Sequence, residues 1–252
     1  MENILSWIPL DITLIAENFD RFLYGVWMTL NLTVLALLLG GLLAIPMAIA
    51  RASRHPVLNP VVWGYTYVLR GTPLLVQTYL IYYGLGQFDL VRESWLWDPI
   101  LSSAWWCALI AFTLNTAAYT TELLCGAIVD TPKGEVEAAI ATGHSYRARM
   151  RRIILPSAFR RAIPAYSNEV IFMLHGSVVA STITLQDILG VGRWLNGRYY
   201  LAYEGFITAA LLYFLIVFTI TRVFRWIERR YLRHLTGRES ADVAEMTPEP
   251  VR

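Results

Sequence analysis

Apolar and polar positions along the chain alternate in long blocks. Five blocks of 17 or more residues contain no Asp, Glu, Lys or Arg, and a membrane-spanning helix needs roughly 17–25 mostly apolar residues. These blocks are residues 22–50, 71–88, 99–121, 170–186 and 205–221. The stretch before position 71, "VVWGYTYVL", is also apolar, so the second block extends backwards past Arg70. The pattern predicts an all-α membrane protein with five transmembrane helices.

The overall composition points the same way. Of the 252 residues, 56% are hydrophobic and 16% are charged, whereas about 25% charged residues is usual in soluble domains. The net charge is only +2, which gives no reason to expect a nucleic-acid partner. A lipid membrane is the partner that the composition favours.

The distribution of positive charge predicts the orientation, because Lys and Arg near spanning helices are concentrated in the cytoplasm. All but four of the 21 basic residues fall on one side of the five predicted spans. The four exceptions are Arg21, Arg92, Arg193 and Arg198. We therefore expect a periplasmic N-terminal segment at residues 1–21 and a membrane domain at residues 22–236. The polar residues 237–252 are expected to form a disordered cytoplasmic tail.

A basic insert, "EAAIATGHSYRARMRRIILP", lies between the third and fourth spans on the predicted cytoplasmic side. Thr131 is expected to cap a first short helix that has Pro132 at its first position. Gly143 can adopt the left-handed conformation that ends such a helix. Ser145 is expected to cap a second short helix, which the Leu-Pro pair at 155–156 ends. The insert is thus predicted to be two short amphipathic helices with a glycine corner.

The residues alone leave three roles open for this insert. It could lie on anionic lipid as a basic amphipathic helix, it could be an ordinary loop, or it could dock in a groove of a partner protein. The small side chains of Ala138, Ala139 and Ala141 favour close approach to protein. Anchoring to lipid would instead favour Trp, Phe or Leu at these positions.

The spacing within the insert resembles the EAA loop of ABC-importer permeases. That motif is Glu-Ala-Ala, three residues, Gly, nine residues, Ile, any residue, then Leu-Pro. Its positions are filled here by Glu137, Ala138, Ala139, Gly143, Ile153, Leu155 and Pro156. The segments "YVLRGTPLLVQ", "FTLNTAAYTTELLCGAI" and "AIPAYSNEVIFMLHGS" extend the similarity over roughly residues 20 to 235. They are similar to the polar amino-acid permeases, above all those for histidine, lysine, arginine, ornithine and opines.

This resemblance implies the fold of a type I ABC importer in a bacterial inner membrane. It implies that the loop docks on a cytoplasmic ATPase dimer, that a homologous second permease completes a heterodimer, and that a periplasmic binding protein delivers the amino acid. The partner ATPase would bind the ATP, and this chain would need no cofactor. Lys133 is the only lysine of the chain, so a P-loop, which requires Gly-Lys, is excluded. We expect no enzyme activity, no catalytic residue and no metal site.

Polar residues within the predicted spans are candidates for a substrate pathway. They are Gln77, Asn115, Tyr119, Glu122, Asn168 and Glu169. Three of them, at positions 115, 119 and 122, share one face of a helix, although a polar contact between helices is the alternative for Tyr119 and Glu122. A carboxylate suits a cationic substrate, and Pro164 is placed where it could break the helix and open Glu169 to a cavity. Arg70 is expected to be an interfacial anchor or part of an ion pair.

Three other functions remain open on the sequence alone. The chain could be a proton-coupled secondary transporter that uses Glu122 and Glu169, although such transporters usually show internal repeats, which this sequence lacks. It could be a permease for neutral polar amino acids such as glutamine. It could also be a membrane scaffold that recruits an ATPase without transporting anything, but carboxylates within the spans argue against this role.

Overall fold

A computed structural model describes residues 12–53, 55–200 and 202–231. Within these ranges the regular structure is helical, and no β-strand is formed. The expected periplasmic segment is therefore described only from residue 12 onwards, where α1 (Ile12–Glu17) begins. The expected tail at residues 237–252 lies outside the described residues.

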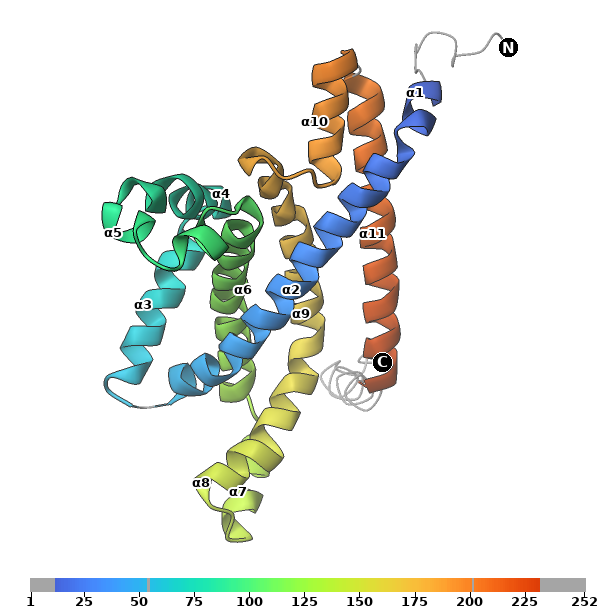
Figure 1. The fold of residues 1–252 in the computed structure, drawn as a ribbon. Coiled ribbons are helices and arrows are strands. Elements are labelled where there is room, and N and C mark those ends of the chain that lie inside the picture. The colour runs from blue at the N-terminus through green and yellow to red at the C-terminus, as the bar shows by residue number, and fades with distance from the viewer. Residues whose placement is uncertain (1–11, 54, 201, 232–252) are drawn as a thin grey trace, which may run out of the picture.

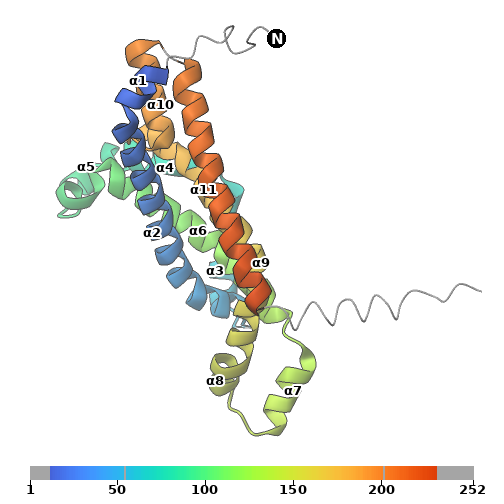
Figure 2. The same ribbon diagram turned by 90° about the vertical axis from the view of Figure 1, so that its right-hand side faces the viewer.

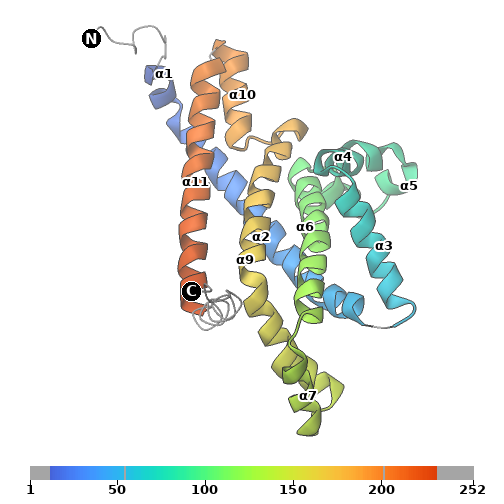
Figure 3. The same ribbon diagram turned by 180° about the vertical axis from the view of Figure 1, so that it is seen from behind.

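The helices of the bundle pack around a central one, α6 (Ala104–Val129), of which more than half of the residues are buried. In Figure 1, α2 (Phe19–Ala52) runs diagonally across it. From behind, α9 (Leu155–Gly176) lies between α6 and α11 (Ala202–Tyr231), as Figure 3 shows. The contact between α2 and α6 is close: a Cβ atom on Gly40 would lie 2.7 Å from the Cγ2 of Thr116. The two helices thus approach closely at Gly40, because glycine has no side chain to hold them apart.

By length and composition, two helices of the described part could each cross a membrane: α2 and residues 202–230 of α11. A third crossing results if Tyr146–Ile183 and Ile188–Tyr199, which are bent by 41°, form one span. The central helix α6 has 26 residues, about 39 Å of rise, but its threonines, Asn115 and Glu122 reduce its mean hydropathy. Since neighbouring helices surround α6, these polar side chains meet protein rather than lipid. The prediction of five transmembrane helices is therefore borne out only in part.

The predicted second span is not one continuous helix. It is divided into α3 (Leu58–Gly71) and α4 (Leu74–Tyr79) by a break at Thr72 and Pro73. Both residues are extended, with φ −115° and ψ 143° at Thr72 and φ −63° and ψ 137° at Pro73. The break follows from the chemistry, since proline has no N–H and forces its predecessor away from helical geometry. Beyond α4 the chain continues through η2 (Leu80–Gly84), η3 (Leu85–Gln87), α5 (Asp89–Arg92) and η4 (Trp97–Leu101).

The remaining spans differ mainly at their ends. The first is confirmed by α2 and the fifth by α11, and both helices exceed the predicted lengths. The third begins later than predicted, because Ser103 is extended and precedes α6, and it ends later, so that Glu122 lies inside the helix. An additional helix, α10 (Ile188–Tyr199), was not predicted. Its N-terminus is capped by Asp187, whose side chain accepts a hydrogen bond from the N–H of Gly190 over 2.7 Å.

The basic insert forms a helical hairpin that projects beyond one end of the bundle (Figures 1 and 2). It comprises α7 (Lys133–Ala141), α8 (Tyr146–Arg149) and the π-helical turn η5 (Met150–Ile154). Gly143 has φ +75°, and Ser145 accepts a hydrogen bond from the N–H of Ala148 over 3.4 Å. The predicted glycine corner and the second cap are thereby confirmed.

Two expectations about the hairpin were wrong. Thr131 does not cap α7: its hydroxyl donates to the carbonyl of Ile128, and Pro132 precedes the helix without a side-chain cap. Pro156 does not end a helix either, since it lies in the first turn of α9. The π-helical turn explains this, because the N–H of Leu155 bonds five residues back to the carbonyl of Met150. Pro156, which has no N–H, then falls in the first turn of α9, where a proline is tolerated. The hairpin therefore continues directly into the fourth span, through α9 and η6 (Ser177–Ile183).

Candidate functional site

A polar cavity of about 500 Å³ lies beside the break in the second span. This volume falls within the roughly 300–1,000 Å³ of small-molecule sites. Three parts of the fold line it: the end of α3 with the start of α4, one face of α6, and the C-terminal part of α9. The lining residues are Arg70, Gly71, Thr72, Pro73, Leu74, Asn115, Tyr119, Glu169, Phe172, Met173 and Gly176.

The wall formed by the break is held by Gln77. Its side-chain nitrogen donates to the carbonyls of Leu69, over 2.7 Å, and of Thr72, over 3.0 Å. The carbonyl of Leu69 lies in the last turn of α3 and that of Thr72 lies in the break itself, where the helix no longer supplies donors. The side-chain oxygen of Gln77 in turn accepts from Asn115 of α6 over 3.1 Å. Gln77 is therefore placed behind the cavity wall, and Asn115 connects this wall to the central helix.

Two opposite charges border the cavity. Glu169 projects from α9 and is buried, with 9% of its surface exposed. Arg70 lies in the last turn of α3, and its guanidinium carbon is 5.2 Å from the centroid of the Tyr119 ring, a cation–π arrangement. The Tyr119 hydroxyl also approaches the carbonyl of Arg70 at 3.4 Å. The cavity thus offers a carboxylate and a guanidinium, which can bind a solute that carries both signs of charge.

The six predicted pathway residues separate into two groups. Asn115, Tyr119 and Glu169 come together in the lining of the cavity. Pro164 was expected to break the helix, but it lies within an unbroken α9, and Glu169 borders the cavity without such a break. Gln77 is behind the wall, and Asn168 is exposed without lining the cavity.

Glu122 is placed elsewhere, at the contact of three helices. Its Oε1 atom accepts from the Nε of Arg51 at the end of α2, over 3.0 Å. The hydroxyl of Thr66 in α3 donates to the same oxygen over 2.6 Å. Arg51 also donates to the Asn59 side chain over 2.8 Å. This carboxylate therefore already has protein partners, whereas Glu169 makes no hydrogen bond within the described part of the chain.

Sequence reasoning assigned Arg70 to an interfacial anchor or to an ion pair and did not place it in a substrate cavity. The signal that could have found it is its position immediately before Gly-Thr-Pro, since a helix break exposes the residue that ends the first half. Phe172 and Gly176 were also missed, because their spacing from Glu169 identifies a helix face but not what that face meets. Among the described residues, no three His, Cys, Asp or Glu side chains come together as metal ligands would.

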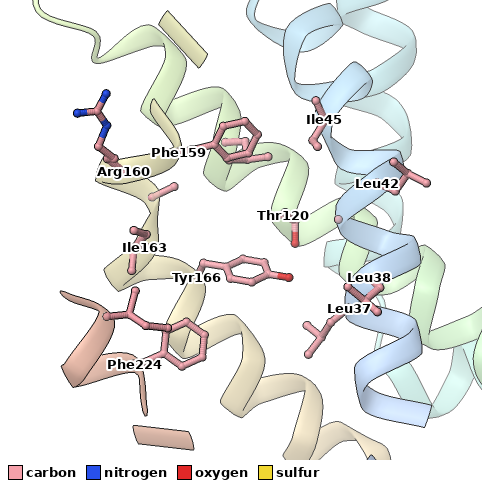
Figure 4. A pocket seen from close by; sticks show the side chains of 14 residues that line it. Leu37, Leu38, Leu42, Ile45, Thr120, Phe159, Arg160, Ile163, Tyr166 and Phe224 are labelled. Atoms are coloured by element: carbon pink, nitrogen blue, oxygen red, sulfur yellow. The ribbon is translucent and has the colours of Figure 1, made fainter. Parts of the chain in front are cut away.

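A second cavity, of about 670 Å³, is almost entirely apolar. Figure 4 shows it between α2, α6, α9 and α11, with leucines of α2 facing Tyr166 and Phe224. Its one charged residue is Arg160, at the edge in Figure 4. Without a carboxylate it has little to recognise a cationic amino acid, and the polar cavity is the better candidate for a substrate site.

The motif residues of the basic insert occupy both the surface and the base of the hairpin. Glu137, Ala138 and Gly143 are exposed, Ala139 is buried, and Ile153, Leu155 and Pro156 are partly buried. Ile140 and Tyr146 add apolar surface, with 55% and 53% of each exposed. The tip of the hairpin thus offers small and apolar groups outside the bundle, as a docking element requires.

Broken helices that border a charged cavity form the substrate sites of many membrane transporters, and this bundle has such a break beside its polar cavity. Residues 36–233 match the family of binding-protein-dependent transport system inner membrane components, and the chain belongs to this family. It is therefore a membrane-integral component of a bacterial ABC importer, as its resemblance implied.

Its relatives include permeases of several transport systems. The chain is 44% identical over 214 residues to the histidine/lysine/arginine/ornithine transport system permease protein HisM of Salmonella typhimurium, covering 85% of this chain and 91% of HisM. It is 38% identical over 240 residues to the nopaline transport system permease protein NocM of Agrobacterium fabrum, covering 94% and 99%. It is 41% identical over 235 residues to the octopine transport system permease protein OccM of Rhizobium radiobacter, covering 91% and 96%.

Solved structures share the fold. A chain of an amino acid ABC transporter crystallised with histidines superposes with a TM-score of 0.79 at 31% sequence identity, covering 88% of this chain and 100% of that chain. A chain of the inward-facing MetNI methionine ABC transporter gives a TM-score of 0.66 at 18% identity, covering 84% and 98%. The second likeness concerns the fold alone, and both agree with the expected type I importer fold.

Proposed function

We propose that this chain imports basic amino acids, such as arginine, ornithine, lysine and histidine, or related opines. The observation that carries the proposal is the polar cavity, which Glu169 and Arg70 both border. A basic amino acid has a cationic side chain and a carboxylate. Glu169 matches the cation and Arg70 matches the carboxylate, because charge-assisted hydrogen bonds of this kind are the strong ones.

The relatives support this choice of substrate class. HisM is named for histidine, lysine, arginine and ornithine, NocM for nopaline and OccM for octopine. A permease for neutral amino acids such as glutamine would use the same fold. The buried carboxylate favours the basic class, because Glu169 makes no hydrogen bond to the described residues and the cationic side chain of a bound substrate would supply the missing donors.

We further propose the assembly and the orientation. The hairpin α7–α8 docks on a dimer of cytoplasmic ABC ATPases, which bind the ATP, and this chain binds no cofactor. A homologous second permease completes a heterodimer, and a periplasmic binding protein delivers the substrate. In the bacterial inner membrane, residues 1–21 then begin on the periplasmic side and the chain ends in the cytoplasm, which agrees with the basic character of the hairpin.

The test compares two carboxylates of the spans in the purified complex, reconstituted with its binding protein. Glu169→Gln should reduce ATP-driven arginine uptake roughly 10- to 100-fold, the loss expected for one charge-assisted hydrogen bond. Glutamine uptake, where it is measurable, should change much less. Glu122→Gln is the matched control, because Glu122 lies outside the cavity and bonds to Arg51. Equal losses of arginine and glutamine uptake with Glu169→Gln would refute the substrate contact.

A further inference from the structure

We propose that Arg161 is a positioning residue that ties both ends of the coupling hairpin to one guanidinium group, so that the hairpin and the two spans around it move together. The proposal rests on the proposed function, in which α7 and α8 dock on the ATPase. It identifies which contact passes a displacement of the hairpin to the helices that border the substrate cavity.

The guanidinium of Arg161 joins the helix that follows the hairpin to the helix that precedes it. Arg161 belongs to α9, and one of its terminal nitrogens donates to the carbonyl of Ala127, near the end of α6, over 2.8 Å. The same nitrogen donates to the hydroxyl of Thr131 over 2.9 Å, in the short linker between α6 and α7. The last carbonyls of a helix have no intrahelical donor and carry partial negative charge. Arg161 therefore caps α6 from the neighbouring helix.

A second set of hydrogen bonds extends from Arg161 to the hairpin itself. The other terminal nitrogen of Arg161 donates to the hydroxyl of Ser157, one turn earlier in α9. Ser157 in turn donates to the Oε2 of Glu135 in the first turn of α7, over 3.0 Å. Glu135, Ser157, Arg161 and Thr131 thus form a continuous chain of charged and hydroxyl groups that joins α7, α9 and the end of α6.

These hydrogen bonds lie beside an otherwise apolar packing surface between α6, η5 and α9. Next to them, Ile128 of α6, Ile154 of η5 and Ala158 of α9 belong to one buried hydrophobic cluster. Apolar packing is non-directional and allows helices to slide, whereas the planar fork of arginine fixes several acceptors at once. The directional contact should therefore determine the angle at which the hairpin leaves the bundle.

Arg160, the neighbouring residue, provides a matched comparison. Its Nε donates to the carbonyl of Pro156 in its own helix over 3.2 Å. Figure 4 shows its side chain at the edge of the apolar cavity. Within the described residues, no hydrogen bond of Arg160 leads to α6 or α7. The two arginines carry the same charge and lie on the same helix, but of the two only Arg161 connects α9 to α6 and to the linker that leads into the hairpin.

The experiment measures the number of arginine molecules imported per ATP hydrolysed, in proteoliposomes that contain the complete importer and its binding protein. Arg161→Gln should leave an assembled complex that hydrolyses ATP but imports roughly tenfold less per ATP, because a coupling between sites is weakened. Arg160→Gln should keep the wild-type ratio. Arg161→Lys should restore the ratio only in part, since a point charge cannot reproduce the fork.

The outcomes separate this inference from the function on which it rests. A wild-type ratio in assembled Arg161→Gln, or full rescue by lysine, would overturn the positioning role. If Arg161→Gln does not assemble, Ser157→Ala decides: it removes the link to Glu135 and keeps the contact of Arg161 with α6, so its ratio should also fall, and an unchanged ratio would overturn the proposal. Absence of ATP-driven uptake in the wild-type complex would instead contradict the proposed function.

Discussion

Charged residues in the spans are used in two different ways. Glu122 accepts from two donors, since Arg51 and Thr66 both donate to its Oε1, and it joins α6 to α3 and to the last turn of α2. Glu169 borders a cavity and has no hydrogen-bond donor among the described residues, which leaves its carboxylate available to a solute. Residue type and position along the chain did not decide between a structural role and a substrate contact for these two carboxylates. Their hydrogen-bond partners in the folded protein separate the two roles.

The first prediction concerns Glu122. Replacing it with Gln keeps an acceptor oxygen beside Arg51 but removes the negative charge, so a partly buried ion pair becomes a neutral-acceptor hydrogen bond. Hydrogen bonds to charged groups contribute about 1.5–3 kcal/mol and neutral ones about 0.5–1.5 kcal/mol, so the loss is on the order of 1 kcal/mol. We expect a lower melting temperature of the purified complex with an unchanged preference among arginine, lysine and glutamine in transport. A change in that preference would place Glu122 in the substrate pathway.

The second prediction concerns the corner of the hairpin. Gly143 has φ +75°, and a Cβ atom there would meet nothing within 4 Å of this chain. Gly143→Asp adds only about 1–2 kcal/mol of backbone strain, but it places a negative charge on the proposed docking surface. We expect the ATPase to be lost on purification of the complex.

Gly143→Asn is the matched control, because asparagine has about the same size as aspartate and the same tolerance of left-handed geometry, but carries no charge. It should retain the ATPase. A complex of Gly143→Asp that keeps its ATPase and transports normally would contradict docking through this corner.

Local features of the hairpin were predictable from the sequence, and tertiary ones were not. The corner at Gly143 and the cap at Ser145 depend on the residue and its immediate neighbours, and both are present. Thr131 has the right chemistry for a cap, but its hydroxyl is bonded to Ile128 and to Arg161 of another helix. A contact between residues 30 positions apart leaves no local pattern.

Among the elements, hydropathy located the helices that face outward and misjudged those that do not. Both α2 and α11 contain a long apolar stretch and were predicted as spans. The central helix α6 was displaced in the prediction, because polar residues buried against other helices resemble the end of a span. The break at Thr72 and Pro73 was hidden within an apolar stretch, although proline is its local cause.

The third prediction tests the contact between α2 and α6. A Cβ atom on Gly40 would lie 2.7 Å from the Cγ2 of Thr116 and 3.0 Å from the carbonyl of Thr113. Gly40→Ala must therefore push the helices apart, at a cost of about 1–3 kcal/mol for overpacking. Thermal denaturation of the complex should show a lower melting temperature.

The matched control is Gly126→Ala in α6, where a Cβ would meet nothing within 4 Å. Alanine favours a helix over glycine by about 1 kcal/mol, so this variant should be as stable as the wild type or more stable. Equal stability of the two alanine variants would mean that α2 and α6 do not pack as closely as described.

At the scale of the whole molecule, two helices connect the polar cavity to the hairpin. Cavity residues come from α6 and α9, and these two helices also lead into and out of the hairpin. The sequence predicted which residues are polar within the spans, but the cavity itself is assembled from segments about 100 residues apart. Its position could not follow from periodicity, which identifies a helix face and not the neighbour of that face.

The central claim is that ATP drives a basic amino acid through this chain and its partners. The most direct test is uptake into proteoliposomes that contain the complex purified with this chain, supplied with its binding protein and with labelled arginine, ornithine, lysine, histidine or glutamine. We predict uptake of the basic amino acids that requires ATP on the side of the membrane where the ATPase lies and that is unaffected by a proton gradient. Uptake driven by a proton gradient without ATP, or uptake of glutamine alone, would contradict the account.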